Sequence, residues 1–363
     1  MTTQLALHTD SFPASERPVT LELLLARDIT PLFVPNYSPG NTQNVPEVLS
    51  SHLATVSPIL THSQQFPLVN AHAIERAETI GVYGMAVDEK NHVWFSSNRI
   101  HTAYDLDPLF SVAARYNDLD IPNFREIAFH DDQAYILDCG TSSYGALFRY
   151  TLPGMNLEKT VPLILSDNYL FSSNSLLFHN DKMIIGSESK CRYGDLRHYV
   201  ISIFDPQTGR LEHVQLEGIT NIFIHGSSLY GLSDRRDIYK RKEPADKENY
   251  YLFAFDDALH PTGYVPLDSP LFTSWLEKIY VDRKGNLFRF GSILNKEKDG
   301  FDPWLAVFDI HGKRIAAGKL PYSFVSIAFD SDNNLIGLAS YKPSRNERDH
   351  ILCLKYRINY RDQ

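Results

Sequence analysis

The stretch MAVDEKNHVWF, from Met85 to Phe95, runs through an apolar strand to an Asp, crosses a short polar turn and starts a second strand. This pattern predicts a tight β-hairpin. The same unit recurs along the whole chain. The other copies are IAFHDDQAYIL at Ile127, LLFHNDKMIIG at Leu176, IFIHGSSLYGL at Ile222, IYVDRKGNLFRF at Ile279, IAFDSDNNLIGL at Ile327 and a degenerate LLARDITPLFV at Leu24.

A second hairpin follows each copy, with YLFAFDDALHPTGYVPL and WLAVFDIHGKRIAAGKL among its clearest forms. The residues at the Asp position of its turn are spaced 46 to 54 residues apart. They are Ser57, Asp105, Thr151, Asp205, Asp256, Asp309 and Arg357. Four short strands in each period near 50 residues, with no amphipathic helix between them, predict an all-β chain folded as a seven-bladed β-propeller.

We expect one propeller domain over residues 1-363. The predicted blades cover approximately 19-75, 80-121, 123-166, 172-217, 218-268, 275-320 and 323-363. Because the last copy ends soon after its third strand, the strand from Thr3 to Thr9 is expected to complete that blade. It would pair near Ile351 to Tyr356 and close the ring, which otherwise leaves a strand edge unpaired. Six blades with an N-terminal extension are the alternative.

The repeated form "apolar-Asp-turn-Gly/Asn-apolar, then Phe-Asp" resembles NHL-type and gluconolactonase-like propellers in architecture, over nearly the whole chain. The WD-repeat signature is missing, because Trp94, Trp275 and Trp304 are followed by Phe, Leu and Leu. Kelch-type Gly-Gly doublets are missing as well. The resemblance therefore concerns the blade pattern.

Composition narrows the classes of partner. The formal charge of -9 argues against nucleic acid, which needs a clustered excess of Lys and Arg. Cys139, Cys191 and Cys353 are too few and too widely spaced for a disulfide framework, which favours a cytoplasmic location. No apolar stretch approaches the roughly 18 residues of a membrane span, so no membrane association is expected.

The loops between the second and third strands of each blade vary most in length, and such loops commonly carry binding specificity. We take them as 35-51, 96-101, 138-146, 187-199, 233-249, 291-303 and 340-349. They hold 15 Lys/Arg and 14 Asp/Glu, against 20 and 30 in the rest of the chain. Loops that are basic relative to an acidic remainder of the chain are expected to attract anions to the mouth of the channel, where they lie. Arg192, Arg235 and Arg236 belong to these loops.

One position, the residue that opens the innermost strand of each blade, is predicted to converge on the channel. In the seven predicted blades, the residues at this position are Leu23, Tyr83, Arg125, Asn174, Thr220, Glu277 and Val325. In gluconolactonase-like propellers, positions of this kind supply the ligands of a divalent metal. Only Asn174 and Glu277 suit such a cation here, and Arg125 would repel it, so we expect no metal or other cofactor. Arg125 and Glu277 would orient a polar substrate or form an ion pair.

His130, His179 and His225 form a second series, which has the composition of a zinc site. They share the turn position of Asp88, Asp282 and Asp330, where a polar side chain caps the following turn. Successive blades would separate them around the ring. We therefore expect structural roles for all three.

Two functions remain open. One is recognition of a small anionic ligand or a protein partner at the channel mouth, contacted by Tyr83, Arg125, Asn174, Thr220 and Glu277 with the adjacent loops. The other is a lactonase- or lyase-type enzyme acting on a carboxylated or phosphorylated sugar-like substrate, with Glu277 as acid or base. No nucleophile elbow or phosphate-binding Gly loop decides between them.

Overall fold

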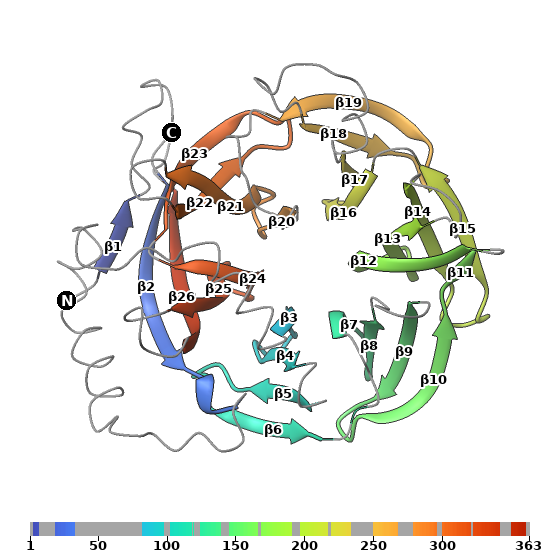
Figure 1. Cartoon of the computed structure of the whole chain (residues 1–363), viewed down its shortest axis with the longest axis horizontal. Coiled ribbons are helices and arrows are strands. Elements are labelled where there is room, and N and C mark those ends of the chain that lie inside the picture. Colours follow the sequence, from blue (N-terminus) through green and yellow to red (C-terminus); the bar gives the residue numbers. More distant parts are fainter. Residues whose placement is uncertain are drawn as a thin grey trace.

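The computed structural model arranges six β-sheets as blades around a central axis (Figure 1), and the part of the molecule along this axis, lined by the innermost strands, is called the channel. The structure describes the following residues: 3-6, 19-32, 82-97, 102-117, 119, 124-138, 145-165, 168-190, 197-216, 219-233, 250-267, 279-295, 300-320, 322-341 and 350-360. Among them no helix is long and apolar enough to cross a membrane.

Each blade is an antiparallel sheet that extends from an innermost strand at the channel to an outermost strand at the rim (Figure 1). Blade 1 contains β3 (Val82–Val87), β4 (Val93–Ser97), β5 (Thr102–Leu106) and β6 (Val112–Tyr116). Blade 2 contains β7 (Phe124–His130), β8 (Gln133–Asp138), β9 (Ala146–Thr151) and β10 (Asn156–Pro162). Blade 3 contains β11 (Ile164–Leu165), β12 (Asn168–His179), β13 (Lys182–Lys190), β14 (Arg197–Phe204) and β15 (Leu211–Leu216).

The remaining blades follow in chain order around the ring (Figure 1). Blade 4 contains β16 (Ile219–His225), β17 (Ser228–Ser233), β18 (Tyr250–Phe255) and β19 (Pro261–Leu267). Blade 5 contains β20 (Ile279–Val281), β21 (Leu287–Asn295), β22 (Gly300–Phe308) and β23 (Arg314–Lys319). Blade 6 contains β24 (Ser323–Phe329), β25 (Leu335–Tyr341), β26 (His350–Tyr360), β2 (Val19–Asp28) and β1 (Thr3–Ala6).

The prediction of seven blades is wrong, because the copy at Leu24 is not a hairpin. Its strand, β2, ends at Asp28, whose side chain accepts hydrogen bonds from the backbone N and Oγ1 of Thr30 and starts a short 3-10 turn, η1 (Thr30–Leu32). Leu23, expected to open an innermost strand, instead pairs with Tyr356 near the rim of blade 6. Most of the predicted first blade lies outside the described residues.

The ring closes through the N-terminal segment, as expected, but with a different strand. β2 pairs with β26 from Val19↔Tyr360 to Asp28↔Leu352 and supplies the fourth strand of blade 6. The strand predicted to do this, within Thr3 to Thr9, is β1, which pairs with β2 as a fifth strand. Arg357, assigned to a turn from the sequence, lies within β26 opposite Glu22, because β26 continues straight to Tyr360.

The hydrophobic core is divided among the blade boundaries. Six clusters of buried side chains are present, and each draws residues from two neighbouring blades. One example joins Ile136 of blade 2 to Trp94 of blade 1, and another joins Leu21 of the closing strand to Phe288 of blade 5. Alternate side chains of each central strand pack into the boundaries on opposite sides of the blade, which explains why these strands are apolar on both faces.

Candidate functional site

The innermost strands share a break in their pairing near the loop end of the channel, which is the end reached by the second-to-third-strand loops. In five of the six blades the register with the second strand shifts there. The residues left out of the ladder include Tyr83, Arg125, Asn174, Thr220 and Val325. A β-bulge bends its strand and redirects a side chain, and bulges are common beside functional sites.

The structure therefore brings the backbone of four predicted site residues, Tyr83, Arg125, Asn174 and Thr220, to one level of the channel wall. Arg125 is the member whose side chain is described, and it is partly exposed. Glu277 lies outside the described residues, directly before β20. Arg192, Arg235 and Arg236 lie outside them as well.

Two hairpins extend the sheet beyond this level. In blade 3, β12 and β13 continue pairing past the bulge to Tyr169↔Lys190, and β13 pairs with β14 as far as Lys190↔Arg197. In blade 5, β21 and β22 pair as far as Asn295↔Gly300. These two hairpins lie on either side of blade 4 (Figure 1). Among the described residues, the second and third strands of blade 4 pair over a shorter range, from Leu229↔Phe255 to Leu232↔Leu252.

Polar side chains are buried at the same level, between the blades. Ser175 Oγ accepts a hydrogen bond from the backbone N of Ile222 in the next blade, at 3.3 Å. Asn221 Oδ1 accepts one from the backbone N of Ile279 in the same way, at 3.2 Å. Each residue directly follows its bulge, so the bulge places a polar side chain against the neighbouring innermost strand.

The boundary between blades 4 and 5 holds residues that the sequence analysis missed. Arg289 is buried, and its Cζ lies 3.9 Å from the ring centroid of Tyr250. Asn221 is buried beside the same boundary. A signal was present in the sequence, because Arg289 interrupts the apolar strand LFRF at a position that faces a blade boundary.

The opposite end of the channel is the turn end, where the first and second strands connect. Asp88, Asp282 and Asp330 begin five-residue turns there, and the Oδ1 atom of each accepts hydrogen bonds from two backbone N atoms, two and four residues later. The fourth residue of each turn has a positive φ and is Asn or Gly. This confirms the capping role expected for the three aspartates.

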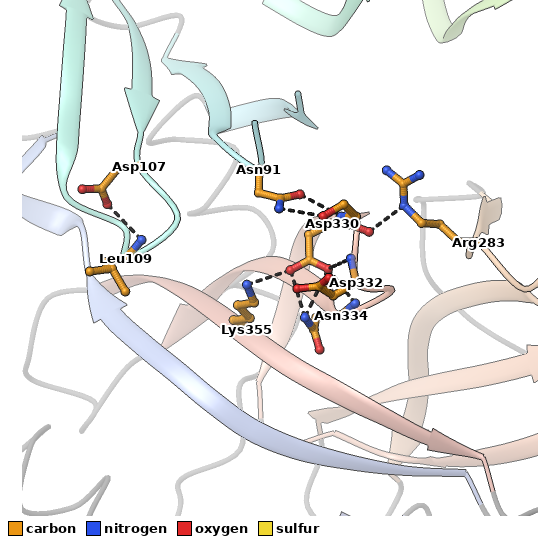
Figure 2. Close-up of polar contacts among 9 residues, drawn as sticks. Asn91, Asp107, Leu109, Arg283, Asp330, Asp332, Asn334 and Lys355 are labelled. Atoms are coloured by element: carbon orange, nitrogen blue, oxygen red, sulfur yellow. Dashed lines mark hydrogen bonds and ion pairs between the residues drawn. The ribbon is translucent and has the colours of Figure 1, made fainter. Parts of the chain in front are cut away.

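Asp330 is the most enclosed of these carboxylates (Figure 2). It is fully buried, and its Oδ2 lies 2.7 Å from Lys355 Nζ on β26. Asn334 and the backbone N of Asp332 also donate to it. Burial by itself raises the pKa of Asp330, but the hydrogen bonds from Lys355 and Asn334 outweigh it and hold that pKa below the usual range.

Side chains of neighbouring turns join blades 5, 6 and 1 (Figure 2). Arg283 Nε donates to the backbone O of Asp330 at 2.7 Å, and its backbone N donates to Asn333 Oδ1 at 2.7 Å. Asn91 Nδ2 donates to Ser331 Oγ at 2.7 Å, and the backbone N of Ser331 donates back to Asn91 Oδ1. This half of the turn end is thus a continuous hydrogen-bonded network.

The three histidines occupy the other half and make a different turn. His130 pairs with Gln133 across two residues, and the turns after His179 and His225 are equally short. His130 stacks on Phe178 of blade 3, with ring centroids 4.3 Å apart, and His179 Nε2 lies 3.6 Å from Asp257 Oδ1 of blade 4. Each of these two rings therefore contacts the next blade rather than the other histidines.

No group of three or more His, Cys, Asp or Glu side chains among the described residues could hold a metal ion. Cys353 is the cysteine that the structure describes. It is buried on β26, and burial raises the pKa of its thiol well above the usual range. Cys139 and Cys191 lie outside the described residues.

Comparison with known proteins concerns the fold alone. No protein-family model matches the chain, and no curated protein matches it. Among solved structures, regucalcin from Agrobacterium tumefaciens, a calcium-binding protein, is 15% identical, with a TM-score of 0.49 over 76% of this chain and 90% of that one. A streptogramin B lyase is 11% identical, with a TM-score of 0.46 over 77% and 94% of the two chains.

A virginiamycin B lyase from Staphylococcus aureus is 10% identical, with a TM-score of 0.45 over 76% of this chain and 94% of that one. The propeller architecture that the sequence repeat predicts is shown by the six antiparallel sheets described above. The chain is a six-bladed β-propeller structurally like virginiamycin B lyase and regucalcin, at low sequence identity.

Proposed function

We propose that this propeller recognises a small anionic ligand at the loop end of its channel and that Arg125 binds the anionic group. The observation that carries the proposal is the repeated bulge. In five blades it takes one equivalent residue of the innermost strand out of the ladder and brings these residues to one level of the channel, although Asn174, predicted to open its strand, lies within β12. Arg125 contributes the charge at that level, and a guanidinium binds carboxylate or phosphate in a bidentate manner.

The charge pattern supports the same end of the channel. The loops at this end hold nearly equal numbers of basic and acidic residues, whereas the rest of the chain has a marked acidic excess. An anion is therefore repelled less by the loop end than by the remaining surface. Arg192, Arg235 and Arg236 in these loops are proposed to assist Arg125.

The test is isothermal titration calorimetry of the Arg125→Ala variant with citrate and with inorganic phosphate as probes. We expect at least tenfold weaker binding, with a melting temperature close to that of the wild type. Arg210→Ala is the matched control, because Arg210 is an exposed arginine in the turn between β14 and β15. Equal affinities for the Arg125→Ala variant and the wild type would overturn the proposal.

The same protein samples test the enzymatic alternative. A ligand that binds the wild type is incubated with it and then analysed by mass spectrometry. Recovery of the intact ligand supports recognition without chemistry. A product that forms with the wild type, and fails to form with a Glu277→Gln variant that still binds, would show an enzyme instead.

A further inference from the structure

The inner turns, which connect the first and second strands of each blade, carry their exposed charges unevenly around the turn end of the channel. All six turns belong to the described part of the chain, as residues 88-92, 130-133, 179-182, 225-228, 282-286 and 330-334. Blade 5 presents two exposed cations and no exposed anion, whereas blade 2 presents two exposed anions and no exposed cation. These residues are Arg283 and Lys284 in blade 5 and Asp131 and Asp132 in blade 2.

The other four inner turns do not concentrate one sign of charge in this way. Blades 1 and 3 each present one exposed acid and one exposed base, blade 4 presents neither, and blade 6 presents one acid. In that order, the charged residues are Glu89 and Lys90, Asp181 and Lys182, and Asp332. Because blades 2 and 5 lie opposite each other in the ring, the turn end has a positive side and a negative side (Figure 1).

The basic side is held in position by contacts within the molecule. Arg283 Nε donates to the backbone O of Asp330 at 2.7 Å, and the backbone N of Arg283 donates to Asn333 Oδ1. Figure 2 shows the two terminal nitrogens of the guanidinium directed away from this network. Lys284 is exposed beside it, with its Nζ 4.9 Å from the ring centroid of Tyr360. A side chain that is already fixed loses less conformational entropy when it binds a carboxylate.

The acidic side is open to a partner. The Asp131 side chain is 86% exposed, and the nearest charged contact given to it is His130 Nε2, at 3.7 Å. Asp132 follows it in the same turn and is exposed as well. Adjacent carboxylates repel each other, so cations that approach this turn are favoured by both charges.

A two-fold rotation brings the two sides together twice. When two copies of the chain meet turn end to turn end about an axis that passes between blades 3 and 4 and between blades 6 and 1, blade 5 of each copy faces blade 2 of the other. The same rotation places blade 1 opposite blade 6 and blade 3 opposite blade 4. The inner turn of blade 4 has no exposed charge, and Lys90 of blade 1 faces the turn that contains Asp332. No two inner turns that present only the same sign of charge are therefore brought together.

We propose that the turn end is a dimer interface, in which Arg283 and Lys284 of one copy bind Asp131 and Asp132 of the other. The partner is a second copy of this chain, because one face presents both signs of charge on opposite blades and a two-fold rotation pairs them at two places. The loop ends of both copies then point away from the interface. The inference thus goes beyond the ligand proposed for the loop end and does not depend on it.

Sedimentation velocity of the full chain tests this interface. The protein is measured at about 50 mM and at about 500 mM sodium chloride, because salt screens exposed charges. We expect a dimer at low salt and at least tenfold weaker association at high salt. Arg283→Glu with Lys284→Glu, and separately Asp131→Lys with Asp132→Lys, should each weaken the dimer at least tenfold at low salt, since each double variant places like charges opposite each other at both contacts.

An equimolar mixture of the two double variants tests whether blade 5 pairs with blade 2. In a mixed dimer, the acidic blade 5 of one variant faces the basic blade 2 of the other, and the acidic blade 2 of the first faces the basic blade 5 of the second. Both contacts therefore recover, and the mixture should dimerise at low salt as the wild type does. Only folded chains can regain the dimer, so recovery also excludes misfolding as the reason for its loss.

Arg115→Glu with Lys159→Glu is the matched control. It changes the net charge as much as Arg283→Glu with Lys284→Glu does, but on exposed residues of the rim strands β6 and β10, and should leave the dimer unchanged. A wild type that stays monomeric at low salt, a dimer that neither double variant weakens, or a mixture that stays monomeric would overturn the interface. A monomeric wild type that binds polyglutamate would instead assign blade 5 to an acidic protein partner.

Discussion

Gly84 and Arg125 show how closely the innermost strands of blades 1 and 2 pack at the level of the bulges. A Cβ atom built on Gly84 would lie 2.4 Å from the backbone O of Arg125 and 2.8 Å from its backbone C. Neither atom is the end of a flexible side chain, so the strand as a whole would have to move. The missing side chain of Gly84 thus allows Arg125 to occupy its place in the channel wall.

We expect Gly84→Ala to destabilise the protein by about 1 to 3 kcal/mol, because overpacking displaces backbone atoms. Urea unfolding measures the loss. Gly263→Ala is the matched control, because a Cβ on Gly263 meets nothing within 4 Å. Equal stabilities for the two variants would show that β3 and β7 can separate at no cost.

Asp330 and Lys355 form the second feature at this scale. The Asp330 carboxylate is fully buried, and its charge is balanced by Lys355. Asp330→Asn should therefore lower the free energy of unfolding by about 3 kcal/mol at pH 7, because it leaves the Lys355 ammonium poorly paired. The pKa of Asp330 is lowered in the folded protein, so its contribution to stability is present above about pH 4, the pKa range of an unfolded Asp, and is lost as the pH falls through the folded value.

The difference in unfolding free energy between wild type and Asp330→Asn should therefore shrink between about pH 4 and pH 2. Urea titrations at several pH values measure it. Asp332→Asn serves as the control, since the Asp332 side chain is exposed. A difference that stays constant down to pH 2 would contradict the assigned pKa shift.

At the scale of elements, one position in the repeat supports two kinds of turn. The aspartate turns hold five residues between the paired strand ends, and the histidine turns hold two residues between a paired His and its partner. The residue type follows from the turn length, because a carboxylate caps backbone N atoms only where the turn is long enough to present them. The histidines use the same position to contact the neighbouring blade.

His130→Asp should consequently destabilise the protein by about 1 kcal/mol through loss of the stacking on Phe178, and ligand binding should persist. Chemical denaturation and a calorimetric titration measure the two effects. His311→Asp is a suitable control, because His311 lies at an exposed turn position between β22 and β23. A stoichiometric metal ion that is lost in the His130→Asp variant would refute the structural role.

At the scale of the whole molecule, each hydrophobic cluster depends on two blades, so no blade completes its core alone. Blade 6 is the place where the two ends of the chain meet. β2 pairs with β26, Glu22 lies 3.2 Å from Arg357 NH1, and Thr30 Oγ1 accepts a hydrogen bond from the backbone N of Ile351. Closure of the ring therefore depends on β2.

Two truncations test this closure. Removal of residues 1-10 takes away β1, the fifth strand of blade 6, and should leave unfolding cooperative with a small loss of stability. Removal of residues 1-28 takes away β2 as well, exposes the edge of β26 and removes Val19 and Leu21 from the core, and should abolish cooperative unfolding. A stable protein without residues 1-28 would show that β2 is dispensable.

The hairpin repeat determined the class of fold, because alternating strands, turn residues and a constant period are local properties. Tyr83, Arg125, Asn174 and Thr220 could be aligned for the same reason, since each occupies the same position of the repeat in its blade. The number of blades could not be read in this way. The copy at Leu24 has the composition of a hairpin, and only the pairing of β2 with β26, more than 300 residues away in sequence, makes it a closing strand.

The contacts that Asn221, Arg289 and Tyr250 make across the boundary between blades 4 and 5 are also a product of tertiary structure. These residues lie on three different strands of two blades, and each belongs to a different position of the repeat, so no alignment of copies brings them together. The bulge after Ile219 places Asn221 against the backbone of Ile279, and the packing of blade 4 against blade 5 places Arg289 over the ring of Tyr250. Local sequence thus determined the hairpins, whereas contacts between distant segments determined the blade number, the closing strand and the contacts between blades 4 and 5.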